Sequence, residues 1–465
     1  MFKRVLVANR GEIAVRIIRA LREMGIESVA IYSDADKDAL HTILADYAYS
    51  LDGNRVQETY TNMDKIINIA KISGSEAIHP GYGFLSETTK FAEAVEGAGI
   101  TFIGPRSNII RLMGDKIEAR KLMADLGTPL IEGSETSIKS YEEAAKIAES
   151  IGYPVLVKAA AGGGGIGMKL VSHQDKLKEA LVAVRNTSIS LFANDSIFLE
   201  KYLSKPRHIE IQILGDKYGN YIHLGERECS IQRRHMKIVE ETPSLAISYE
   251  ITEKMCETAV RIANSVGYDS AGTVEFIYED GEFYFLEMNT RIQVEHTITE
   301  MVTSLDIVKE QIAIAAGEPL KIKQEDIKFN GHAIECRIYA EDPTKYFIPS
   351  PGKITNYIAP GGPGVRLDSG IKSDYTVSTY YDSMLSKLIT FGMDRDEAIS
   401  RMCRALTETC IEGIDTNIPL LIEIMKDGDF KDGNISTKFL EEHSSLINKG
   451  SNKKKTIFVS IDDPQ

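Results

Sequence analysis

The strongest chemical signal in the sequence is a run of four glycines, 162–165, with Lys158 four residues before it. Glycine has no Cβ atom, so the backbone N–H groups of such a run can approach phosphate oxygens closely. The GK[ST] ending of a P-loop is missing, and a strand-like segment follows where a dinucleotide fingerprint needs a helix. A flexible linker is the ordinary alternative. The β-patterned segments 153–158 and 168–171 on either side favour a flap that covers phosphates.

A second group of side chains could hold a metal ion: Glu275, Glu287 and Asn289 in a predicted β-hairpin. A two-residue loop at 280–281 would put the two glutamates on opposite faces. A three-residue loop at 279–281, with glycine in the left-handed position, would make them diagonal neighbours on one face, roughly 7–8 Å apart. We predict the three-residue loop. Two carboxylates and an amide then suit Mg²⁺, although solvated glutamates are the common alternative.

A third group could bind an anion. Arg291 can hold a planar anion through two parallel hydrogen bonds, and Glu295 follows closely as a possible base. The segment 233–237 (RRHMK) adds a basic cluster to an acidic protein. Each cluster alone is more often a charged surface than a site. We predict that they converge on one pocket.

The elements that must position these groups begin with alternating strands and helices over residues 1–114. Residues 5–8 form a short apolar strand, and 11–24 have the apolar spacing of a helix. This alternation predicts a doubly wound parallel sheet, which binds ligands at the carboxyl ends of its strands. The segments 9–12 and 79–87 fall at that edge.

Four regions are predicted in all, in a multidomain α/β and α+β protein. An N-terminal Rossmann-like domain covers 1–114. A second domain, 115–330, contains a lid at 130–203 and is rich in antiparallel strands. A third domain covers 331–446, and 447–465 match no folded pattern, which predicts a flexible tail.

Composition limits the class of protein. The net charge of −14 argues against a nucleic-acid binder with a general basic field. The five cysteines form no CxxC pair, which indicates reduced thiols, and no apolar stretch approaches the roughly 18 residues of a membrane span. We expect a soluble cytoplasmic protein with no nucleic-acid or membrane partner.

The chain resembles biotin carboxylase, a family of ATP-grasp ligases. The likeness runs in order from Met1 to about residue 446, and the pair HPGYGFLSE and EMNTRIQVEH is its most specific part. The other matching segments are ANRGEIAVRIIRA, GDK, VKAAAGGGGIGM, EKYL, PRHIEIQ, ERECSIQRRHMK, GTVEF and ECRIYAED. Within the family, the chain is most similar to the free-standing subunit of acetyl-CoA carboxylase and to the biotin carboxylase subunit of a two-subunit pyruvate carboxylase. Another ATP-grasp ligase, of the carbamoyl-phosphate or purine-pathway type, is the alternative.

The resemblance implies an ATP-dependent ligase that carboxylates biotin through carboxyphosphate. The implied ATP-binding residues are Lys116, Lys158, Gly163, Gly164, Gly165, Met168, Glu200, Lys201, Leu203, His208, Gln232 and His235. The implied bicarbonate pocket consists of Lys237, Arg291, Gln293, Val294 and Glu295, with Glu295 as the base. Tyr82 and Arg337 would face biotin, with Asp382 orienting Arg337. Lys237, Arg291, Glu295 and Arg337 would be catalytic, and Glu275, Glu287 and Asn289 would carry two Mg²⁺ ions, for which Mn²⁺ could substitute.

The same resemblance implies partners: a biotin carboxyl carrier protein or domain, a subunit with carboxyltransferase activity, and a second copy of the chain. A carrier presents its lysine in an AMKM-like hairpin, and the Met-Lys pairs here lie in other contexts, so we expect biotin on another polypeptide. Two departures from the family's pattern concern Ile166 in the flap, where a basic residue is usual, and Pro363 at an aromatic dimer position. The remaining dimer set matches at Arg16, Arg19, Glu23 and Arg366. The final acceptor, pyruvate or acetyl-CoA, stays open.

Overall fold

The N-terminal region forms a five-stranded parallel sheet in the order β3-β2-β1-β4-β5. The computed structural model describes residues 1–134, 136–159, 167–192, 194–234 and 236–451. The strands are β1 (Arg4–Val7), β2 (Glu27–Tyr32), β3 (Tyr47–Ser50), β4 (Ala77–His79) and β5 (Thr101–Phe102). The helices are α1 (Gly11–Glu23), α2 (Leu40–Leu44), α3 (Met63–Ile72), α4 (Thr89–Gly97) and α5 (Ser107–Gly114). Apolar side chains pack on both faces of this sheet, so the predicted doubly wound sheet is confirmed.

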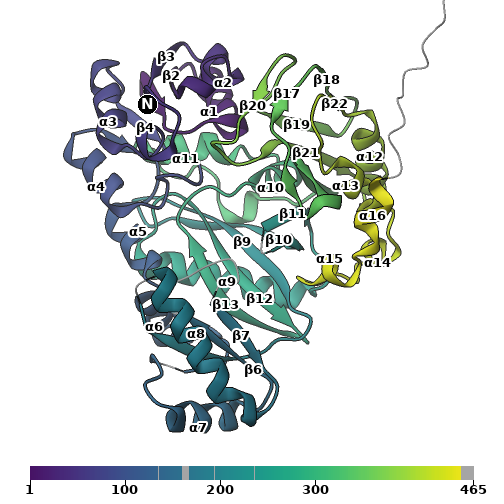
Figure 1. The fold of residues 1–465 in the computed structure, drawn as a ribbon. Coiled ribbons are helices and arrows are strands. Elements are labelled where there is room, and N and C mark those ends of the chain that lie inside the picture. Colours follow the sequence, from purple (N-terminus) through teal and green to yellow (C-terminus); the bar gives the residue numbers. More distant parts are fainter. Residues whose placement is uncertain (135, 160–166, 193, 235, 452–465) are drawn as a thin grey trace, which may run out of the picture.

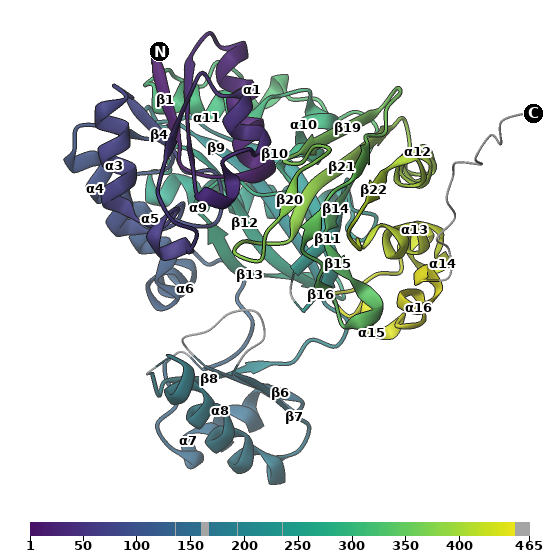
Figure 2. The ribbon, with the colours of Figure 1, turned by 45° about the horizontal axis from the view of Figure 1, so that its top comes forward.

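A small separate unit projects from the body of the molecule (Figure 2). Its three-stranded sheet has the order β7-β6-β8, with strands β6 (Val155–Ala159), β7 (Met168–Val171) and β8 (Ile197–Lys201). Helices α7 (Tyr141–Ile151) and α8 (Leu177–Phe192) pack against it around their own apolar core. Helix α6 (Lys116–Asp125) precedes this unit and packs with the body. The unit lies within the range predicted as a lid.

One eight-stranded sheet runs through the rest of the body, in the order β13-β12-β9-β10-β11-β14-β21-β19. Its strands are β9 (Arg207–Gly215), β10 (Tyr221–Arg233), β11 (Met236–Thr242), β12 (Ala271–Glu279), β13 (Glu282–Asn289), β14 (His332–Tyr339), β19 (Val365–Ser369) and β21 (Met384–Gly392). The antiparallel β11–β14 pair joins the residues before 330 to those after it. The predicted second and third domains therefore share a single sheet.

Helices cover this sheet, and the chain ends in a helical cluster beside it (Figure 1). The helices are α9 (Tyr249–Val266), α10 (His296–Thr303), α11 (Ile307–Ala315), α12 (Arg395–Glu408), α13 (Ile418–Lys426), α14 (Gly428–Lys431), α15 (Phe439–Glu442) and α16 (Ser445–Ser451). Short strands complete the C-terminal part: β15 (Glu341–Asp342), β16 (Ile348–Pro349), β17 (Gly352–Lys353), β18 (Asn356–Ile358), β20 (Thr376–Val377) and β22 (Cys410–Glu412). Helix α16 takes up the start of the predicted tail, whose remainder, 452–465, lies outside the described residues. Among the described residues, no helix is long and apolar enough to cross a membrane.

Arg227 on β10 is fully buried between the sheet and α10, and its guanidinium group is surrounded by polar partners. Its Nε lies 2.5 Å from Glu210 Oε1, and its Nη1 donates to Gln212 Oε1 at 2.7 Å. Further contacts reach the hydroxyls of Thr273 and Thr299. A buried cation of this kind is tolerated only because its partners replace the lost water. The Arg227 network therefore fixes β9, β10, β12 and α10 relative to one another.

We predict that Arg227→Met lowers the free energy of unfolding by about 3–5 kcal/mol, because Glu210 loses a buried partner. The midpoint of urea unfolding, followed by circular dichroism, measures this loss. Arg111→Met is the matched control, since Arg111 forms an exposed ion pair with Glu118 and its removal should cost about 1 kcal/mol or less. Equal effects of the two substitutions would contradict the prediction.

Candidate functional site

The β12–β13 hairpin corrects one prediction and explains how its carboxylates meet. The loop has two residues, Asp280 and Gly281, both with positive φ, so the predicted three-residue loop is wrong. A β-bulge in β13 at Leu286 adds one residue after Phe285, and Glu275 is thereby paired directly with Glu287. The two glutamates share a face although the loop is short, because the bulge reverses the side-chain alternation.

The bulge also allows the apolar side chains of β13 on both sides of it to face the core. Phe283 and Phe285 pack into the apolar core before the bulge, and Met288 packs into the same core after it. Asn289 lies opposite Thr273, on the face that carries Glu287. The sequence requires this switch of parity, since a regular strand would expose Met288 and bury Glu287.

Lys237 on β11 is the central cation of the site. Its ammonium group donates to Glu210 Oε2 at 2.6 Å, to Glu275 Oε1 at 2.9 Å and to Glu295 Oε1 at 2.7 Å. The three carboxylates come from β9, β12 and the start of α10, and they hold the pKa of Lys237 well above its usual range despite its burial. The predicted convergence of Lys237 and Glu295 is therefore present in the structure.

Glu295 is clamped between two cations. Its Oε1 faces Lys237, and its Oε2 accepts a hydrogen bond from Arg337 Nη2 at 2.9 Å. Burial would favour the neutral acid, but Lys237, Arg337 and Arg227 outweigh it and lower the pKa of Glu295 well below its usual range. The carboxylate is therefore ionised at neutral pH, which is the form that can accept a proton.

Arg291 connects the loop after β13 to the N-terminal region. Its Nε donates to Glu87 Oε2 at 2.9 Å, while Nη1 donates to Gln293 Oε1 at 2.9 Å and Nη2 to Asn289 Oδ1 at 3.0 Å. Gln293 in turn donates to Glu275 Oε1 at 2.9 Å. The predicted anion-binding and metal-binding residues thus form one hydrogen-bonded network.

The candidate metal ligands differ in their surroundings. Glu275 accepts hydrogen bonds from Lys237 and Gln293, with the His208 ring 3.2 Å away, and Lys237 and His208 lower its pKa despite burial. Glu287 is exposed, yet partial desolvation and the nearby Glu275 charge raise its pKa. A divalent cation would relieve this repulsion, so the donor set fits Mg²⁺.

The residues predicted to bind ATP are divided between the lid and the body. Lys158 and Glu200 pair with one another on the lid sheet, and Arg120 Nη1 lies 3.3 Å from the same carboxylate. His208 and Gln232 face each other on β9 and β10 at 3.3 Å. Four more of the predicted residues are placed on or next to α6, β7 and β8: Lys116, Met168, Lys201 and Leu203. The predicted Gly163, Gly164, Gly165 and His235, and Ile166 in the flap, lie outside the described residues.

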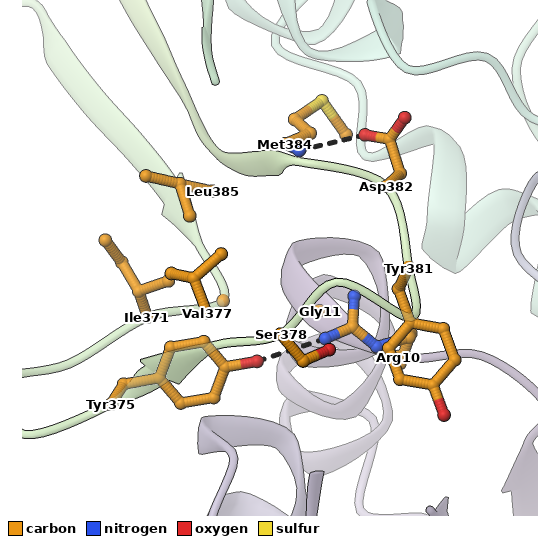
Figure 3. Close-up of a pocket in the computed structure, with 11 residues that line it drawn as sticks. Arg10, Gly11, Ile371, Tyr375, Val377, Ser378, Tyr381, Asp382, Met384 and Leu385 are labelled. Carbon is orange, nitrogen blue, oxygen red and sulfur yellow. Dashed lines mark hydrogen bonds between the residues drawn. The ribbon is translucent and has the colours of Figure 1, made fainter. Parts of the chain in front are cut away.

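Lys387 is a neighbour of both residues predicted to face biotin, Tyr82 and Arg337. The Lys387 ammonium lies 6.0 Å from the centre of the Tyr82 ring and donates to the Val294 carbonyl at 2.7 Å. In β14 and β21, Arg337 and Lys387 are directly paired. The expected contact between Asp382 and Arg337 is wrong. Asp382 accepts a hydrogen bond from the Met384 N–H (Figure 3), whereas Arg337 pairs with Glu240 and Glu295.

Several residues of the site were not identified from the sequence. Glu87 could have been, since it ends the HPGYGFLSE motif. Glu210 interrupts an alternating isoleucine strand, and a charged residue in such a strand indicates a buried polar partner. Glu12 lies in the segment 9–12 that was predicted at the ligand-binding edge, but it was not singled out. Glu240 and Lys387 gave no local signal, because strand pairing brings them to the site.

Three family models match the chain. One is described as "Biotin carboxylase, N-terminal domain" over residues 1–110, one as "Carbamoyl-phosphate synthase L chain, ATP binding domain" over 115–323, and one as "Biotin carboxylase C-terminal domain" over 335–442. The A subunit of pyruvate carboxylase from Methanothermobacter thermautotrophicus is 53% identical, covering 95% of this chain and 90% of its own. Biotin carboxylase 1 of Bacillus subtilis is 52% identical over 96% of this chain and its entire own length.

A solved structure is similar to this chain in both sequence and fold. It is the biotin carboxylase domain dimer of Hydrogenobacter thermophilus 2-oxoglutarate carboxylase, in complex with MgADP, ADP and bicarbonate. Its TM-score is 0.91 at 51% identity, covering 96% of this chain and 99% of that one. The likeness covers the N-terminal sheet, the lid and the eight-stranded sheet together.

Glu12, beside Lys387, gives the site a testable pH dependence. Burial raises its pKa to about 7, with the Asp368 and Glu335 charges adding to the effect and Lys387 opposing it. Because the folded-state pKa exceeds the ordinary 4.5, the protonated Glu12 carboxyl favours the folded state. This contribution to stability is fully present below pH 4.5 and is lost as pH rises through 7. In the Glu12→Gln variant, the side chain at this position cannot ionise. The unfolding free energy of this variant should therefore gain about 2 kcal/mol relative to wild type between pH 5 and 8.

Urea unfolding at pH 5, 6.5 and 8 measures this difference. The exposed Glu257 on α9 provides the control, because Glu257→Gln should follow the wild-type pH dependence. A constant difference between Glu12→Gln and wild type across this range would show that the Glu12 carboxyl does not titrate there.

Proposed function

The chain belongs to the biotin carboxylase family, and from that premise we propose which of its residues carries each step. The enzyme is an ATP-dependent ligase that carboxylates biotin with bicarbonate, the first half-reaction of a biotin-dependent carboxylase. A carbamoyl-phosphate or purine-pathway ligase is the weaker alternative. It would explain the match over residues 115–323, but not the biotin carboxylase models that match 1–110 and 335–442.

The observation that carries our assignment is Glu295 held between Lys237 and Arg337. We assign Glu295 as the base that removes the bicarbonate proton, which requires an ionised carboxylate within hydrogen-bonding reach. Arg291, Gln293 and the Val294 backbone complete the bicarbonate pocket. Deprotonated bicarbonate then attacks the γ-phosphate of ATP, which forms carboxyphosphate and releases ADP.

We assign the nucleotide to the cleft between the lid and the body. Lys116 and Lys158 contact its phosphates, and Glu200, Lys201 and Leu203 receive the adenine and ribose with His208 and Gln232. Glu275, Glu287 and Asn289 would hold Mg²⁺, which supplies positive charge against the developing charge of the phosphates. Met168 closes the nucleotide pocket from the lid.

The second step places biotin between Tyr82 and Arg337. Carboxyphosphate decays to CO₂ and phosphate, and the phosphate takes the proton from the ureido nitrogen of biotin. The Arg337 guanidinium stabilises the negative charge that develops on the ureido oxygen. The carboxyl group then passes from CO₂ to that nitrogen.

Partners are assigned from the same premise. A separate carrier presents biotin, and a carboxyltransferase subunit completes the reaction. The relatives differ in the acceptors that their names give, pyruvate and 2-oxoglutarate, so pyruvate, acetyl-CoA and 2-oxoglutarate are all candidates for that subunit. We propose a homodimer through the surface hollow that contains Arg16, Arg19, Glu23 and Arg366.

We keep the domain division 1–114, 115–330 and 331–446 as a proposal, with the last two regions joined by the β11–β14 pair. The cytoplasmic location is also a proposal. It rests on the five cysteines, all of them free thiols in the structure.

Replacing Glu287 tests the metal assignment. Glu287→Gln keeps the size of the side chain but removes a negative charge opposite Glu275, so Mg²⁺-dependent nucleotide binding should weaken about tenfold or more. Calorimetric titration with MgADP measures the change. ADP without Mg²⁺ serves as the control and should bind both proteins alike. Unchanged MgADP affinity would contradict the assignment.

Replacing Glu295 and Arg337 separates the two steps. Glu295→Gln should reduce bicarbonate-dependent ATP hydrolysis by the ~10²–10⁴-fold typical of a general base. Arg337→Gln should reduce carboxybiotin formation far more than bicarbonate-dependent ATP hydrolysis, because Arg337 acts after carboxyphosphate has formed. Phosphate release and carboxylation of free biotin are the two measurements.

The ratio of the two activities decides the assignment. If both variants lose both activities in the same proportion, with lowered melting temperatures, the residues support the fold and have no separate chemical roles.

A further inference from the structure

Arg337 contacts a second carboxyl group besides that of the proposed base. Its Nη2 lies 2.5 Å from Oε1 of Glu240 and 2.9 Å from Oε2 of Glu295. Glu240 lies on β11, next to the strand that carries Arg337, and is 1% exposed. Neither Glu240 oxygen accepts an aligned hydrogen bond from the part of the chain that the structure describes. The contact is therefore a close approach of the Arg337 guanidinium group to the buried Glu240 carboxyl, without an aligned hydrogen bond.

The proposed reaction explains why one anion would not be enough. When Glu295 takes the proton of bicarbonate, it loses the charge that holds Arg337. Arg337 acts only afterwards, when negative charge develops on biotin. A guanidinium group buried to this degree needs an anion beside it to stay in place, because water cannot replace the lost partner.

We propose that Glu240 is a positioning residue that holds Arg337 in place for the carboxylation of biotin after Glu295 has been protonated. This inference rests on the proposed roles of Glu295 and Arg337. The Glu240–Arg337 ion pair then becomes the stronger of the two. One proton enters on Glu295 and one leaves Glu240 to solvent, so the charge of the three groups stays constant.

The electrostatics of Glu240 fit such an exchange. Burial raises the pKa of Glu240 to about 8, Arg337 and Lys237 oppose the rise, and the charges of Glu335 and Glu295 increase it. Protonation of Glu295 removes one of these causes, which favours the ionised form of Glu240 at that stage. The groups that face Glu240 are thus Lys237 on its own strand, Arg337 and Glu335 on β14, and Glu295 at the start of α10.

The chain offers a closely matched control in Glu335. It lies directly opposite Glu240 in the β11–β14 pair and is equally buried, but its carboxylate accepts a hydrogen bond from Thr297. Burial raises its pKa as well, to about 7. Glu335→Gln therefore removes a comparable carboxyl group without removing an ion pair to Arg337.

The experiment measures carboxybiotin formed per ADP produced, with free biotin, in wild type, Glu240→Gln, Glu240→Asp and Glu335→Gln. This ratio does not depend on the fraction of folded enzyme, because both products come from one sample. We expect Glu240→Gln to lower the ratio roughly tenfold or more, because a buried cation loses one of its two carboxylate partners. Glu240→Asp keeps the charge and should recover part of the ratio, and Glu335→Gln should keep the wild-type ratio.

Two outcomes overturn the inference. A wild-type ratio in Glu240→Gln would show that Glu295 alone positions Arg337. An equal fall in Glu240→Gln and Glu335→Gln would show that any buried carboxyl of this pair supports the site. The Arg337→Gln variant separates these failures from failure of the proposed function: if it too keeps the wild-type ratio, the role of Arg337 itself is wrong.

Discussion

The Lys237 ammonium group accommodates three carboxylates within 3 Å, and the arrangement of the body follows from that requirement. Glu210, Glu275 and Glu295 belong to segments separated by up to 85 residues of sequence. Three carboxylates buried at this depth need cations beside them, and Lys237 is the cation that they share. Arg227 is a second buried cation of this kind, and it pairs with the other carboxylate oxygen of Glu210. Two buried cations thus hold β9, β11, β12 and α10 in one geometry. The network costs desolvation energy, and it keeps the Glu295 carboxylate ionised.

The continuous eight-stranded sheet extends this constraint across the molecule. Because β11 pairs with β14, Lys237 and Arg337 approach Glu295 from two neighbouring strands. A flexible linker between separate domains could not keep both cations within 3 Å of one carboxylate. The sheet joins the bicarbonate-binding residues to the biotin-facing residue, which are assigned to successive steps of the reaction.

The sequence could predict what depends on local pattern or on motifs. The N-terminal parallel sheet, the lid strands β6 and β7 and the grouping of Lys237, Glu275, Arg291 and Glu295 were predicted correctly. The β-bulge at Leu286 was missed, because the choice between a short loop with a bulge and a longer loop depends on packing of Phe285 and Met288 on the core. Glu240 was missed because only the pairing of β11 with β14 brings it to Arg337. The Asp382 expectation failed for a related reason: its own backbone turn supplies a nearer donor.

The lid and the body hold their proposed site residues differently, and this difference bears on the order of the proposed steps. On the body, every proposed bicarbonate-binding side chain already has a partner from the same rigid sheet or the loop that follows it. On the lid, Lys158 and Glu200 pair with each other across β6 and β8, on a unit that projects from the body (Figure 2). A nucleotide that binds to both residues must replace this partly exposed ion pair, which contributes little to the stability of the lid. The Lys158–Glu200 pair would therefore oppose nucleotide binding only weakly, whereas the proposed base already lies between Lys237 and Arg337. On the proposed assignment, the placement of the nucleotide beside this base would then decide when carboxyphosphate forms.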